Sequence, residues 1–123
     1  FLLIGPGFSS IRLESQPDFE VAHLLHCSGV QVTLPVIYDG GSSFGTMQLC
    51  GTAGQSSLRF GNTTYQNFLG QMLSFIDFVR TGRAPYPFTE TVELMAILIA
   101  GLRSRAEKSR RVEIAEILSS LSP

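Results

Sequence analysis

His23 and His26 are the only histidines of the chain and the first candidates for chemistry. They stand three positions apart in a run with strand-like alternation, so their side chains should point to opposite faces of a sheet. In that arrangement the two imidazoles cannot hold one metal ion together. One of them could contact a substrate, because imidazole titrates near neutral pH, but a hydrogen-bonded sheet histidine is the simpler interpretation. We expect neither residue to be catalytic.

Nucleophiles have no better support in the sequence. A serine nucleophile needs a nearby base and a third group that orients the base, and no GxSxG motif occurs. Cys27 and Cys50 are the only cysteines. They form no CxxC motif and are too few for a zinc quartet or a disulfide framework. Two reduced, packed cysteines of a cytoplasmic protein are the expected state, with a bridge between them as the alternative.

Phosphate-binding loops are incomplete. Residues 4–8 (IGPGF) contain two glycines, but Ser10 occupies the third glycine position of GxGxxG and Pro6 has no amide to offer a pyrophosphate. Neither GxxxxGKS nor GxxxxGKT occurs. A basic cluster near the C-terminus could meet a phosphate, although a solvated helix end is the simpler interpretation; it comprises Arg103, Arg105, Lys108, Arg110 and Arg111. The sequence therefore predicts no catalytic, cofactor-binding or metal-binding residue.

Composition limits the kind of protein that carries these residues. The 123 residues suffice for one domain, and 44% apolar with 15% charged residues excludes a disordered chain. A net charge of −1 argues against a nucleic-acid partner. The longest uncharged apolar stretch, residues 94–102, is far shorter than the ~20 residues that cross a bilayer. We expect a soluble, cytoplasmic domain and, because the first residue is Phe1, a piece of a longer chain.

The first half of the chain alternates with the period of a strand. We expect strands at residues 19–27, 30–38, 44–50 and 56–60. One face of the second strand should carry Val30, Val32, Leu34, Val36 and Tyr38. Pro35 cannot donate to a strand ladder, so it predicts an edge strand or a bulge. Residues 39–43 (DGGSS) are typical of a hairpin connection.

The second half has helical periodicity. Residues 65–80 carry apolar side chains three and four positions apart, and Gly82 should end this helix. A proline-containing connector at residues 83–88 leads to a second helix from Thr89, and a short strand should follow at residues 112–114. Strands followed by helices predict an α+β fold, with an open-faced, largely antiparallel sheet and two main helices on one face.

This arrangement predicts a core and an open surface. In the core we expect Val32, Leu34, Val36, Met47 and Leu49 against Phe68, Met72, Phe75 and Ile76, with Ile97 and Ile99 nearby. The opposite face should display Leu24, His26, Gln31, Thr33, Ile37, Phe44, Thr46 and Gln48. That mixture is too apolar for free solvent and predicts a two-fold oligomer interface. The alternative is that further parts of a longer chain cover the face.

From residue 49 onward the sequence resembles a known family. Residues 50–58 (CGTAGQSSL) resemble the "G-t-x-G-s-l" strand turn in the C-terminal domain of the glucose–fructose oxidoreductase / inositol dehydrogenase (Gfo/Idh/MocA) family. Residues 75–85 (FIDFVRTGRAP) are similar to its "F-x-x-a-i-x-t-G-x-x-P". Residues 90–94 and 100–107 resemble its "a-l-x-a-l…A-x-y-x-S-a" helix, and residues 111–114 (RVEI) its closing "r-x-V-x-L". Residues 1–17 are a lead-in segment that aligns with nothing in the family.

The resemblance implies a function for a longer protein. Family members carry an N-terminal Rossmann domain that holds NAD(P), followed by an α+β domain that contributes to the substrate pocket and often to oligomer contacts. The family's E-K-P lysine and catalytic histidine lie upstream and have no counterpart here. We therefore expect residues 1–123 to form one C-terminal domain of an NAD(P)-dependent oxidoreductase acting on a sugar, polyol or related hydroxyl compound.

On this hypothesis the fragment supplies substrate-side scaffold and oligomer contacts. It would hold no cofactor and be inactive alone, and its partners would be the Rossmann domain of the same chain and a second copy. The alternative is a stand-alone, non-catalytic α+β module for binding or dimerisation.

Overall fold

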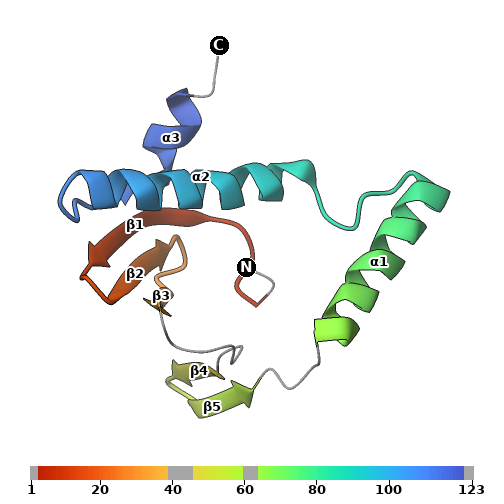
Figure 1. The fold of residues 1–123 in the computed structure, drawn as a ribbon, viewed down its shortest axis with the longest axis horizontal. Helices are drawn as coiled ribbons and strands as arrows, with labels where there is room; N and C mark the ends of the chain where they lie inside the picture. The colour runs from red at the N-terminus through yellow and green to blue at the C-terminus, as the bar shows by residue number, and fades with distance from the viewer. Residues whose placement is uncertain (1–2, 39–45, 60–63, 121–123) are drawn as a thin grey trace. The chain divides into compact units, whose positions relative to one another are not determined.

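Strands precede helices along most of the chain, and the fold is α+β with antiparallel strands, as the sequence predicts (Figure 1). The computed structural model describes residues 3–38, 46–59 and 64–120. The chain divides into two compact units. The first contains Phe1–Asp39 and Tyr86–Pro123, and the second contains Gly40–Pro85.

The first unit is built on a four-stranded antiparallel sheet. Its strands, in spatial order, are β3 (Gln31–Ile37), β2 (Phe19–His26), β1 (Phe8–Ser15) and β6 (Val112–Glu113). Two helices pack against this sheet, α2 (Phe88–Ala106) along β1 and α3 (Ile114–Ser120) against α2 and β1 (Figure 1). The segment before residue 18, expected only as a lead-in, thus provides an inner strand of the sheet.

The core of the first unit lies between β1, β2 and α2. Its buried apolar residues are Phe8, Ile11, Leu13, Ala22, Leu24, Ala96, Ile97, Ala100, Val112, Ile114 and Ile117. Small residues on α2 allow the helix to approach the strand closely. At Gly101 an added Cβ would lie 3.3 Å from Cδ1 of Ile11. We call the sheet face under α2 the covered face and the opposite one the uncovered face.

This core differs from the expected one. Ile97 is in it and Val32 packs at its margin, but Leu34 on β3 is 50% exposed. The reason is the position of β3 at the edge of the sheet, where Pro35 predicted it, while α2 contacts β1. Other residues expected in the core are exposed as well, namely Val36, Leu49, Phe68, Met72, Phe75, Ile76 and Ile99.

The second unit contains a hairpin and a helix. The hairpin consists of β4 (Thr46–Gly51) and β5 (Gly54–Arg59), paired in register. The helix, α1 (Thr64–Thr81), ends where Gly82 adopts φ +67°, a conformation that favours glycine. Residues 39–43, expected to form a hairpin connection, lie outside the described part of the chain. No described helix is long and apolar enough to span a membrane.

Ser104 connects α2 to two backbone segments. Its side chain is fully buried. The hydroxyl accepts a hydrogen bond from the Leu13 amide at 2.9 Å and donates one to the Arg110 carbonyl at 2.6 Å. β6 pairs with β1 only at Ser10 and Ile11, so Ser104 supplies the partner that Leu13 lacks beyond the end of β6.

Substitution of Ser104 by alanine should lower the free energy of unfolding by roughly 1–3 kcal/mol, because a buried amide loses its partner. Urea unfolding followed by circular dichroism measures this change. The control is Ser57→Ala at an exposed position on β5, expected to stay within about 0.5 kcal/mol of the unmodified chain. Equal unfolding curves for the two variants would contradict the role assigned to Ser104.

Candidate functional site

The uncovered face carries a row of basic side chains across three neighbouring segments. The strand register places Arg12 of β1 opposite His23 of β2, and His23 opposite Thr33 of β3. On the other side of β1, Ser10 pairs with Glu113. Arg111, which precedes β6, therefore stands beside Arg12. Strand alternation sends these side chains away from α2, because their neighbour Ile11 points into the core.

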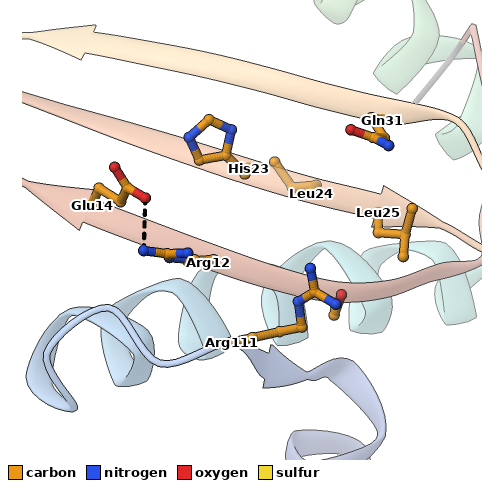
Figure 2. Close-up of a pocket in the computed structure, with 8 residues that line it drawn as sticks. Arg12, Glu14, His23, Leu24, Leu25, Gln31 and Arg111 are labelled. Carbon is orange, nitrogen blue, oxygen red and sulfur yellow. Dashed lines mark ion pairs between the residues drawn. The ribbon is translucent and has the colours of Figure 1, made fainter.

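A hollow of about 350 Å³ opens along this row (Figure 2). It is lined by Ser10, Arg12, Glu14, His23, Leu24, Leu25, Gln31 and Arg111. Figure 2 shows Arg111 reaching over β1 and Arg12 paired with Glu14. The lining offers hydrogen-bond donors and positive charge, and the side chains that meet there suit binding better than nucleophilic catalysis.

Only one acidic side chain of the lining compensates these charges. Nη2 of Arg12 lies 3.0 Å from Oε1 of Glu14, and both side chains are about half exposed. Nδ1 of His23 lies 3.3 Å from Oγ1 of Thr33. Arg111 forms no ion pair with any carboxylate in the described part of the chain. Ser10 is only 3% exposed and lines the hollow from β1.

The expected interface residues are only partly placed on the uncovered face. Gln31, Thr33 and Ile37 lie there and are exposed, as predicted. Leu24 and His26 were wrongly assigned, since each is only 6% exposed and lies on the covered face. The register explains the error, because Leu24 pairs with Val32 and directly opposed residues share a face.

The remaining expected interface residues belong to the second unit. Thr46 and Gln48 are exposed on β4, and Phe44 lies outside the described residues. The positions that sequence interpretation missed are on β2, where Phe19, Val21, His23 and Leu25 occupy the uncovered face. The period-two pattern separates the two faces of β2 correctly. The pattern does not show which face of β2 lies on the same side of the sheet as a given face of β3.

His26 is a structural histidine. Its Nε2 donates to the Pro6 carbonyl at 2.9 Å, while Nδ1 accepts from the Ser28 amide at 3.2 Å and lies 2.8 Å from the Ser28 hydroxyl. The Sγ of Cys27 is 3.8 Å from Nδ1, but both ring nitrogens are already engaged. His26 is thus the hydrogen-bonded sheet histidine that the sequence suggests, and it is not positioned as a base for Cys27.

The two cysteines are free and exposed. The expectation that both are packed is wrong. Cys27 lies in the turn after β2. Cys50 lies near the end of β4, the first strand of the hairpin. Among the described residues, no group of three His, Cys, Asp or Glu side chains is arranged to hold a metal ion.

Most of the C-terminal basic cluster is neutralised. Arg105 pairs with Glu20, and Arg103 and Arg110 pair with Glu107. Arg110 also contacts Glu116 at 3.0 Å, and this contact lowers the pKa of Glu116 to about 2. These pairs tie the end of α2 to α3, which favours the structural interpretation of the cluster over phosphate binding.

Glu20 is a buried carboxylate with a similar structural role. It accepts hydrogen bonds from the Ser15 hydroxyl at 2.8 Å and from Nη1 of Arg105 at 3.1 Å. The Ser15 contact, followed by that of Arg105, holds the pKa of Glu20 below its ordinary value although burial opposes this. The carboxylate therefore stays ionised and links the β1–β2 hairpin to the C-terminal part of α2.

Comparisons of the chain with models of protein families, with curated proteins and with solved structures find no match.

The pKa of Glu20 makes stability depend on pH. Because the folded state lowers this pKa, the contribution of Glu20 is complete above the ordinary value of 4.5 and is lost as the pH falls below it. Glu20→Gln should therefore flatten the acidic limb of a plot of unfolding free energy against pH. Glu90→Gln, at a carboxylate with no ion pair among the described residues, is the control. Parallel curves for the unmodified chain and Glu20→Gln would contradict this assignment.

Proposed function

We propose that the chain is the C-terminal, substrate-side domain of a cytoplasmic NAD(P)-dependent oxidoreductase of the Gfo/Idh/MocA type, acting on a sugar, polyol or related hydroxyl compound. One observation carries the proposal: four motif residues of the resemblance lie where the backbone conformation or the core favours their residue type, namely Gly54, Gly82, Ser104 and Val112. The motifs also occur in the chain order of the elements, with the hairpin β4–β5 first, then α1, α2 and β6.

The glycine motifs coincide with backbone conformations that favour glycine. Gly54 opens β5 with φ +130°, directly after the hairpin turn, and Gly82 ends α1 with φ +67°. A side chain at either position would strain the backbone. A proline connector follows Gly82 and leads into α2.

The two remaining motif residues are buried at the junction of helix and sheet. Ser104 of the "A-x-y-x-S-a" motif forms the hydrogen bonds to Leu13 and Arg110. Val112 of the closing motif is fully buried in the core. These matches support a shared architecture, and in this proposal the chain contributes scaffold rather than reacting groups.

The cofactor would bind to another part of the parent protein. Gly5 and Gly7 lead into strand β1, so they deliver no phosphate to the N-terminus of a helix, as a dinucleotide fold does. On this proposal NAD or NADP belongs to a Rossmann domain of the same chain, and this domain closes one side of the substrate pocket.

A stand-alone association module is the second candidate, favoured by the composition of the uncovered face. Phe19 is 43% exposed and Ile37 is 64% exposed at opposed positions of β2 and β3. Val21 and Leu25 extend this apolar surface along β2. Exposed apolar patches mark interfaces, and we propose that a second copy of the chain covers this one. Self-association is compatible with both the oxidoreductase domain and the association module. Binding of NAD(P) by the parent protein is expected only for the oxidoreductase.

The product of the whole gene should bind NADH or NADPH with micromolar affinity, and residues 1–123 alone should bind neither. Titration calorimetry of both proteins in the same buffer measures this difference. Binding by the 123-residue chain would show that this chain contains a nucleotide site of its own and would contradict the proposal. If neither protein binds either nucleotide, the oxidoreductase proposal fails and the association module is favoured.

Self-association should depend on the uncovered face. Ile37→Lys should shift the chain toward monomer in light scattering, because burial of an unpaired charge in an interface is costly. Leu34→Lys is the matched control, since Leu34 is exposed to a similar degree on the covered face of the same strand. A chain that is already monomeric at high micromolar concentration would contradict the interface, as would an equal effect of the two variants.

A further inference from the structure

We propose that the hollow on the uncovered face of the first unit binds a small oxyanion, the carboxylate or phosphate group of a small molecule, between Arg12 and Arg111. This inference goes beyond the proposed function. It does not depend on NAD(P) binding by a parent protein. Leu25 belongs both to the lining of the hollow and to the surface proposed for self-association, so the oligomer mass is measured alongside anion binding.

The first observation is the placement of like charges. Arg111 stands beside Arg12, because the pairing of Ser10 with Glu113 and of Ile11 with Val112 continues to these two positions. Like charges on directly neighbouring strands are destabilising. Glu14 pairs with Arg12 alone. A bound oxyanion would convert this repulsion into two charge-assisted contacts, and guanidinium groups match the geometry of carboxylate and phosphate oxygens.

The second observation is Ser10, at the base of the row. The residue is only 3% exposed, yet it lines the hollow. A serine hydroxyl can donate a hydrogen bond to an oxyanion. Ser10 could therefore contact a ligand oxygen that is held by Arg111.

The remaining groups around the hollow define what fits. Leu25 and Gln31 border it on the β2 and β3 side. Glu113 is the other acidic residue of this face, opposite Ser10, but it does not line the hollow. The volume of about 350 Å³ suits a small organic acid or phosphate ester rather than a polymer.

The test is a nuclear magnetic resonance titration of the 123-residue chain with inorganic phosphate and, separately, with succinate. Sodium chloride of equal ionic strength serves as the reference. We expect saturable shifts of the Ser10 and Arg12 amides and of the Arg111 side chain. The stronger of the two probes identifies the oxyanion as phosphate or carboxylate.

Variants locate the binding. Arg111→Gln should weaken the affinity about tenfold, whereas Arg83→Gln removes the same charge from an exposed connector and should leave it unchanged. Ser10→Ala should weaken it about threefold, with Ser57→Ala as its control. In chloride alone, Arg111→Gln should unfold at a temperature equal to or above that of the unmodified chain, because a like charge has been removed.

Several results would overturn the proposal. Shifts that do not saturate, or equal weakening by Arg111→Gln and Arg83→Gln, would indicate general charge screening. A lower unfolding temperature of Arg111→Gln in chloride would make Arg111 a structural contact. If Arg111→Gln lowers the oligomer mass while anion affinity is unchanged, the arginines serve an acidic group of a partner subunit. None of these results would affect the NAD(P) titration of the whole gene product.

Discussion

The close packing of α2 along β1 is the contact on which the first unit depends. Ala96, Ala100 and Gly101 bring the helix backbone near the strand, and Ser104 replaces a strand partner for Leu13. At the other end of the interface, Oε1 of Glu93 accepts hydrogen bonds from the amides of Gly7 and Phe8, at 2.7 and 2.8 Å. The helix is therefore fixed to β1 at both ends by side-chain hydrogen bonds and between them by apolar contact.

The side chains that β1 contributes to the core and those that it contributes to the candidate site lie on opposite faces of this strand. Ile11 and Leu13 face α2, so the alternating positions Ser10, Arg12 and Glu14 must face away from it. A shift of the register by one residue would exchange the two sets and place charge against the helix. The burial that stabilises the unit thus also determines which side chains gather at the hollow. The site needs no loop of its own to position it.

Alternation, proline and glycine patterns predicted those parts of the fold that are determined by residues close together in the sequence. The alternation of residues 30–38 indicated β3, Pro35 indicated its edge position, and Gly82 indicated the end of α1. β1 was missed because its short apolar alternation is interrupted by a bulge between Phe8 and Ser10, and because one of its two partners, β6, is distant in sequence.

The candidate site was even less accessible to sequence interpretation. Arg12 and Arg111 line the same hollow only because β6 returns to pair with β1, and a period-two pattern contains no information about such pairing.

The division of the chain into two units gives the exposed thiols of Cys27 and Cys50 a practical use. Each unit carries one of them. A pair of spin labels attached to the natural sequence would therefore report the distance between the units, and its distribution, without any engineered attachment point.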